Sequence, residues 1–235
     1  MGSRGVAGVA WWMRRPAVAA VLVVVLVATV VAVLGVRARG ADVDRCTRFA
    51  ADSRARAAQV TGTGERVVVI GDSWSAGLGL DRVAGSWPSR LPGSVHVAGF
   101  SGSGFSEQAS PCGRVSFADR APAALRGGAD LVVVEGGLND YDVASADVRA
   151  GFRRLMAELR GYDVVVVGPA TAPSRAAEVP RVDDLLADLA AAYGVGYVRT
   201  SGLDLPYLDD GLHLTPAGHQ AFGDDVAARI AALGS

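Results

Sequence analysis

A serine, an asparagine and an Asp/His pair occupy positions in this chain where they could act on one bond together. Ser73 follows a run of four branched apolar residues through Gly71-Asp72, and Asn139 follows another apolar run and a Gly-Gly pair. Asp210 and His213 lie three residues apart in the loop before the last helical stretch, and residues 99–104 are rich in Gly and Ser. A nucleophile, a base, a group that orients the base and donors for an oxyanion are the parts that acyl transfer needs.

Short apolar runs alternate with helical patterns in the part of the chain that has to position these residues. An open α/β sheet binds its ligands at the carboxyl ends of its strands, and right-handed crossovers bring those ends to one edge. The sequence therefore predicts a three-layer α/β/α sandwich around a five-stranded parallel sheet in flavodoxin-like order. The predicted strands are residues 66–70, 94–98, 131–135, 164–168 and 196–199, and the predicted helices are residues 74–80, 117–126, 144–160, 179–193 and 216–233.

Four sequence blocks, taken in order, resemble those of the SGNH/GDSL-type hydrolase family. Each block is weak alone, but the four in order span nearly the whole globular region. The blocks are Ile70 to Gly77, Ala98 to Gly102, Gly137 to Asp140, and Asp210 to His213 followed by Thr215 to His219.

The resemblance implies a role for each candidate residue. Ser73 would attack an ester carbonyl, His213 would carry the proton, and Asp210 would orient the imidazole. The backbone N–H groups of Ser73 and Gly102 and the side-chain amide of Asn139 would hold the oxyanion. No metal or organic cofactor is implied, and the substrate is an ester of an acetylated glycan or of a lipid.

Other titratable residues near the blocks are expected to have structural roles. Asp72 is expected to cap the helix after the first strand, and Asp140 to anchor the Asn139 loop. Glu135 ends a strand next to the site, where a bracing role is expected. His96, within a strand pattern, and His219, in the first turn of the last helix, are both expected to be structural.

The N-terminal part of the chain has the composition of a membrane anchor. Residues 16–36 carry no charge and are numerous enough to span a bilayer. The run is long for a signal peptide and no good cleavage site follows it, so we predict an uncleaved anchor, with a cleaved signal and a secreted protein as the alternative. Residues 1–15 would be a cytoplasmic tail, residues 37–64 a linker with a short helix at 50–60, and residues 65–235 the hydrolase domain.

The two cysteines, Cys46 and Cys112, both follow the predicted span. In an oxidising exterior they could form a disulfide, and the alternative is two unpaired thiols. The net charge of −1 gives no indication of a nucleic-acid partner.

We therefore predict a single-pass membrane protein whose extracytoplasmic domain is a serine esterase that works through an acyl-enzyme. Two alternatives remain at this point. The first is an O-acyltransferase acting on cell-envelope glycans, because an acyl-enzyme can pass its acyl group to a sugar hydroxyl as well as to water. The second is a catalytically silent binding module on the same fold. The sequence gives no indication of the oligomeric state.

Overall fold

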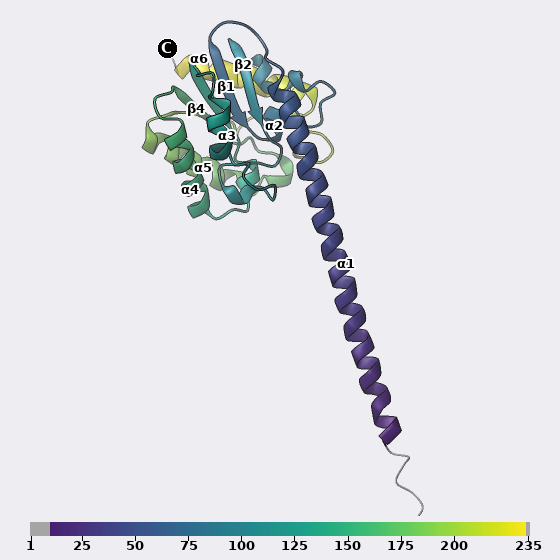
Figure 1. Ribbon diagram of the computed structural model, residues 1–235. Helices are drawn as coiled ribbons and strands as arrows, with labels where there is room; N and C mark the ends of the chain where they lie inside the picture. Colours follow the sequence, from purple (N-terminus) through teal and green to yellow (C-terminus); the bar gives the residue numbers. More distant parts are fainter. Residues whose placement is uncertain (1–9, 234–235) are drawn as a thin grey trace, which may run out of the picture. The chain divides into compact units, whose positions relative to one another are not determined.

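A computed structural model describes residues 10–233 of the chain (Figure 1). It divides into two compact units, Met1–Arg45 and Cys46–Ser235, and helix α1 (Ala10–Ala57) runs through the boundary between them. Residues 1–9 of the predicted tail and the last two residues of the predicted hydrolase domain lie outside the described residues.

In the first unit, α1 is long and apolar enough to cross a membrane, a test that a signal sequence also passes. Its side chains from Leu22 to Leu34 are exposed, although most are large and apolar. Residues 37–57, which we predicted as linker with one short helix near its end, continue α1 without a break. The physical reason is their composition, since this stretch is rich in Ala and Arg, which favour helix, and contains no Pro.

The second unit is built on the predicted five-stranded parallel sheet. All neighbouring strands pair in parallel, in the order β2-β1-β3-β4-β5, which confirms the flavodoxin-like arrangement. The first three strands share one register, with Ile70 of β1 opposite Ala98 of β2 and Val134 of β3. The strands are β1 (Arg66–Gly71), β2 (Ser94–Gly99), β3 (Leu131–Glu135), β4 (Val164–Val167) and β5 (Gly196–Val198).

Helices cover both faces of the sheet. Successive side chains of a strand point to opposite faces, so strands that are apolar throughout have to be buried on both sides. Val68 and Ile70 of β1 pack with α3, α4 and α5, whereas Val67 and Val69 pack with α6 and a short 3-10 helix, η2. The helices are α2 (Ser73–Ala76), α3 (Phe117–Ala124), α4 (Ser145–Glu158), α5 (Val179–Tyr193) and α6 (Pro216–Leu233), and the 3-10 helices are η1 (Val83–Gly85), η2 (Trp87–Arg90), η3 (Glu107–Ala109), η4 (Leu138–Asp140) and η5 (Pro173–Arg175).

Helix α2 is shorter than the predicted helix at 74–80. It ends at Gly77, which adopts a left-handed conformation with φ of 80° and donates its N–H to the Ser73 carbonyl. A Cβ at this position would lie 2.9 Å from the Val83 carbonyl oxygen, so glycine is needed for both its conformation and its size. The single turn of α2 holds Ser73 directly against the end of β1.

In this strand order, β2 and β3 lie on opposite sides of β1, so the direction in which strands are added to the sheet reverses at β1. The chain leaves β1 toward β2 on one side and then returns to β3 on the other. The carboxyl ends of β1 and β3 therefore lie at the switch point of the sheet, which is where open α/β sheets bind ligands.

Candidate active site

The first element of the site is the turn that carries Ser73. Asp72 caps α2 as predicted, because its Oδ1 accepts a hydrogen bond of 2.9 Å from the Trp74 backbone N–H. Ser73 occupies the first position of the helix and is 6% exposed, so its side chain is largely buried in this structure.

The second element is the loop that carries Asp210 and His213. One oxygen of the Asp210 carboxylate accepts from the backbone N–H groups of Leu212 and His213, both at 2.9 Å. The other lies 2.6 Å from Nδ1 of the His213 ring. Partial burial opposes the ionisation of Asp210, but these bonds outweigh it and lower the pKa of Asp210 to about 2. A ring that donates from Nδ1 keeps the lone pair of Nε2 for taking up a proton.

A hydrogen bond from the side chain of Trp74 connects these two elements. The indole Nε1 donates to the Leu212 carbonyl at 3.0 Å, so the residue after Ser73 is bonded to the residue before His213. The same indole packs edge-on against Phe222 of α6, with ring centroids 5.1 Å apart. The structure thus bonds the segment that carries Ser73 to the segment that carries His213, although the two residues are 140 positions apart in the sequence.

The third element is Asn139, in η4 after β3. Its Nδ2 donates to the Ser103 carbonyl at 2.9 Å and to Asp72 Oδ2 at 3.2 Å, while its Oδ1 accepts from Arg175 Nη1 at 3.0 Å. Donors and acceptors on both sides fix which end of the amide points toward the serine turn. The asparagine therefore lies between the loops after β1 and β2.

The fourth element is the glycine-rich turn after β2. Gly102 adopts a left-handed conformation with φ of 77° and is half-buried. Ser103 closes the turn, because both its backbone N–H and its hydroxyl donate to the Phe100 carbonyl, at 3.1 and 2.8 Å. The turn is bonded to the Asn139 loop through the Ser103 carbonyl, so the predicted oxyanion donors belong to connected segments.

Asp140 makes a second connection between these two loops, as the sequence predicted. Its carboxylate accepts from the backbone N–H of Phe105 at 3.0 Å and from that of Ser106 at 2.9 Å. Asp140 is fully buried, and burial raises its pKa to about 7, although both backbone donors oppose the shift. The side chain next to Asn139 is therefore a structural clamp.

Buried carboxyl groups lie beneath the serine turn. Glu135 Oε2 accepts from the Ser75 hydroxyl at 2.6 Å and from Trp87 Nε1 at 3.3 Å, which is the bracing role predicted for it. Burial, together with the charge of Asp72, raises the pKa of Glu135 well above its usual value. Burial also raises the pKa of Asp72, to about 6, although the Trp74 N–H and the neighbouring His213 and Arg175 oppose the shift.

Arg120, on α3, is a half-buried cation that the sequence analysis did not single out. Its guanidinium donates to the Gly71 carbonyl at 2.9 Å, to the Ala98 carbonyl and to the Ser103 hydroxyl at 2.9 Å. It thereby holds the ends of β1 and β2 and the glycine-rich turn in one arrangement.

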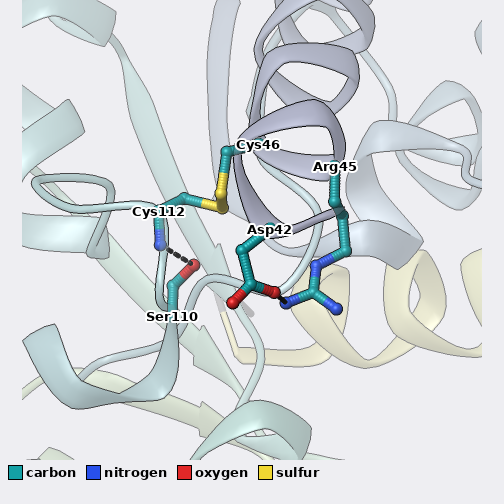
Figure 2. The surroundings of a disulfide bond; sticks show 5 residues. All are labelled: Asp42, Arg45, Cys46, Ser110 and Cys112. Carbon is teal, nitrogen blue, oxygen red and sulfur yellow. Dashed lines mark hydrogen bonds and ion pairs between the residues drawn. A yellow bond between two sulfur atoms is a disulfide. The ribbon is translucent and has the colours of Figure 1, made fainter. Parts of the chain in front are cut away.

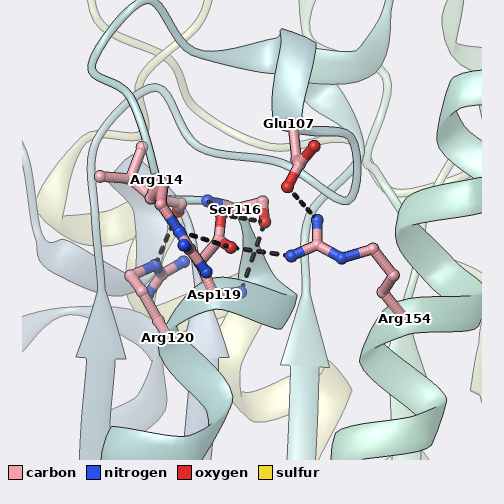
Figure 3. Close-up of polar contacts among 7 residues, drawn as sticks. Glu107, Arg114, Ser116, Asp119, Arg120 and Arg154 are labelled. Atoms are coloured by element: carbon pink, nitrogen blue, oxygen red, sulfur yellow. Dashed lines mark hydrogen bonds and ion pairs between the residues drawn. The ribbon is translucent and has the colours of Figure 1, made fainter.

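The first turn of α3 is itself fixed by polar contacts (Figure 3). Asp119 and Ser116 form a capping box, and Arg154 of α4 bonds to Asp119 at 2.8 Å. Because these contacts fix the start of α3, they also fix the position from which Arg120 reaches the strand ends.

Arg175 is the second cation that the sequence analysis missed. It lies in η5, in the loop after β4, and donates to the Leu138 carbonyl as well as to Asn139. A signal for it was available, because the rule that polar residues after a strand end converge on the site applies to β4 as well.

The two other histidines have structural partners, as predicted. His96 in β2 contacts the guanidinium of Arg66, with 2.7 Å from its Nε2 to Arg66 Nη1. His219 is buried, and its Nδ1 accepts from the Trp87 backbone N–H at 3.3 Å. Neither contact belongs to the Asp210–His213 pair.

Several solved structures with the same fold are named as esterases. Est24, a carbohydrate acetylesterase from Sinorhizobium meliloti, aligns with a TM-score of 0.59 and 20% identity over 72% of this chain and 100% of its own. An aryl esterase from M. smegmatis aligns with a TM-score of 0.58 and 19% identity over 72% and 100%. A family two carbohydrate esterase from Clostridium thermocellum aligns with a TM-score of 0.60 and 18% identity over 74% and 66%.

The sequence gives the family directly. No curated protein sequence matches the chain significantly. The profile of the GDSL-like Lipase/Acylhydrolase family matches residues 69–221, which are more than half of the chain and include every block noted in the sequence. The chain belongs to the GDSL-like lipase/acylhydrolase family and is a serine carboxylic ester hydrolase with the SGNH fold.

Proposed function

We propose that the protein is a membrane-anchored, extracytoplasmic esterase in which Ser73, His213 and Asp210 form the catalytic triad. The observation that carries this assignment is the Trp74–Leu212 hydrogen bond. It ties the residue after Ser73 to the residue before His213, while Asp210 holds the His213 ring by Nδ1.

In the first half of the reaction, Ser73 Oγ attacks the carbonyl carbon of the ester and His213 Nε2 takes up the serine proton. The tetrahedral intermediate collapses with cleavage of the bond to the alcohol oxygen, which receives the proton from His213. In the second half, water attacks the acyl-enzyme, with His213 again accepting and returning one proton. The products are the carboxylic acid, the alcohol and the free serine.

The oxyanion would be held by the backbone N–H groups of Ser73 and Gly102 and by the Nδ2 group of Asn139. In the resting structure both hydrogens of Nδ2 have partners, so the amide has to release one of them to bind the oxyanion. The bond to Asp72 at 3.2 Å is the longer of the two and is the one we expect to be exchanged.

The apolar, exposed part of α1 supports the anchoring half of the proposal. Residues 16–36 would span the membrane and leave the catalytic unit outside the cytoplasm, where a disulfide between Cys46 and Cys112 is stable. The domain division is then a tail at 1–15, the anchor, a helical connection and the hydrolase domain at 65–235.

The proposal also concerns the class of carboxylic ester that the enzyme hydrolyses. Two of the solved structures above are named carbohydrate esterases, so acetylated glycans are the first substrates to test, and lipid esters are the second. Release of acetate from acetylated xylan, compared with release of fatty acid from a lysophospholipid, distinguishes these substrates.

The triad is tested by Ser73→Ala in the full chain. We expect hydrolysis of p-nitrophenyl acetate to fall to the background rate, labelling by a fluorophosphonate probe to disappear, and the thermal unfolding midpoint to stay close to that of the wild type. Undiminished turnover in this variant would exclude Ser73 as the nucleophile.

A further inference from the structure

The last turns of α1, residues 46–57, contact the loops of the site although they lie outside the family match at 69–221. Figure 2 shows the first of these contacts, the disulfide between Cys46 and Cys112, which joins α1 to the segment that follows the glycine-rich turn. Residues 46–57, which we call the juxtamembrane helix, belong to the same compact unit as the hydrolase domain.

The second contact places an aromatic ring beside a predicted oxyanion donor. Phe49 packs edge-on against Phe100, with ring centroids 6.3 Å apart and an interplanar angle of 84°. A Cβ built on Gly102 would lie 3.8 Å from Phe49 Cε2, in ordinary van der Waals contact. Phe100 is buried whereas Phe49 is only half-buried, so part of Phe49 remains accessible beside this turn.

The third contact reaches the serine turn from the end of the juxtamembrane helix. Arg56 is fully buried, and its Nε donates to the Ser86 hydroxyl at 3.1 Å. That hydroxyl donates to the Ser75 carbonyl in α2, also at 3.1 Å. Because Cys46 fixes one end of the juxtamembrane helix and Arg56 the other, the helix cannot easily carry Phe49 away from the Gly102 turn.

We propose that Phe49 is a specificity-determining residue, an apolar wall that limits the length of the acyl group which the site accepts. This inference rests on the proposed function. In that mechanism the leaving alcohol has to lie at His213 to receive its proton, so the acyl group is the part of the ester that can extend along the Gly102 turn. A rigid ring at that turn leaves room for a short acyl group and obstructs a long one.

The test compares p-nitrophenyl acetate, butyrate and hexanoate as substrates of the full chain in detergent micelles. For Phe49→Ala we expect the ratio of kcat/KM for hexanoate to that for acetate to rise about tenfold or more, because one methylene in an apolar pocket is worth roughly 10–200-fold. Phe49→Leu should give an intermediate ratio. The ratio does not depend on the fraction of folded enzyme, so a partly destabilised variant still gives an answer.

Tyr193→Ala is the matched control. Tyr193 is a 44% exposed ring that packs against Phe152 at 5.7 Å, and it lies beside Val164 at the amino end of β4, away from the site. Its replacement should leave the ratio unchanged. An unchanged or lower ratio in Phe49→Ala would overturn the assignment of Phe49 even if all activity depends on Ser73. Activity that survives Ser73→Ala would instead overturn the proposed function.

Discussion

Loss of the Cys46–Cys112 disulfide should lower the stability of the unit Cys46–Ser235 substantially. The bond joins residues 66 positions apart, and the loop that it closes contains β1 and β2. In the chain-entropy description, a cross-link over a loop of this length restricts the unfolded chain by about 4 kcal/mol at 25 °C. The perturbation is Cys46→Ser/Cys112→Ser, which leaves no single thiol to form intermolecular bonds.

The measurement is the thermal unfolding midpoint of the full chain in micelles, followed by the fluorescence of Trp74 and Trp87, which are both buried in this unit. For a unit of this size, 1 kcal/mol corresponds to about 2–4 °C, so the expected decrease is about 8–16 °C. Wild-type protein treated with a reductant should show the same decrease, and wild-type protein without reductant is the reference.

The size of the decrease decides between two accounts of the bond. A midpoint within about 2 °C of the wild type would refute the reasoning, because the cross-link would then impose no constraint on the unfolded chain. A decrease of the expected size in the double variant but not in reduced wild type would attribute the loss to the serine side chains rather than to the bond.

Two further predictions concern the groups around Asn139. Arg175→Met removes the donor that fixes Asn139 Oδ1, so kcat for p-nitrophenyl acetate should fall at least about tenfold with little change in KM. Loss of a whole oxyanion donor costs about 100–1,000-fold, which sets the upper range of the effect. Arg175→Lys should recover part of the rate, and a change confined to KM would contradict this prediction. Burial raises the pKa of Asp140 from 3.8 to about 7 in the folded state. Between these two pH values the folded protein binds more protons than the unfolded chain. The contribution of Asp140 to the free energy of unfolding therefore declines as pH rises. The free energy of unfolding, measured at pH 4.5 and 7.5, should therefore decline more with pH in the wild type than in Asp140→Asn, and equal pH dependence in the two proteins would contradict the raised pKa.

The fold was predictable because the strands are apolar on both faces. Strands such as residues 131–135 and 164–167 have to be buried on both faces, which requires a sheet with helices on both sides. Such sheets are parallel, and their functional loops lie at one edge. The positions of Ser73, Asn139 and the Asp210–His213 loop follow from that edge. The length of α2 did not follow, because it depends on the close approach of Val83 to Gly77.

The end of β4 indicates that Arg175 lies near the site, but its bond to Asn139 and the contributions of Phe49 and Arg56 could not be predicted. An arginine in a polar loop has the same local sequence whether it is solvated or bonded to Asn139, and only the packing of the β4 loop decides between these cases. The juxtamembrane helix follows an apolar run and is rich in Arg and Ala, so its sequence carries no clear apolar stripe. Its role arises from contacts with residues that are 30 or more positions away along the chain.

The charges around the site favour the chemistry that we propose. Arg120 bonds to the Gly71 carbonyl before the serine turn, and Arg175 bonds to Asn139. Burial lowers the pKa of Arg120 to about 10, which leaves its guanidinium charged at neutral pH. Both cations therefore lie next to segments that, in the proposed mechanism, hold the negative charge of the tetrahedral intermediate.

These cations are held in place before any substrate binds, because Arg120 and Arg175 donate to the backbone carbonyls of Gly71 and Leu138. Dipoles and charges that are oriented in advance stabilise a developing oxyanion without the cost of reorganisation. The carboxylate of Asp72 opposes them in the resting enzyme, where it accepts from Asn139. In the proposed mechanism, Asn139 would turn one N–H from Asp72 to the oxyanion, and Arg120 and Arg175 would oppose the combined negative charge of Asp72 and the oxyanion.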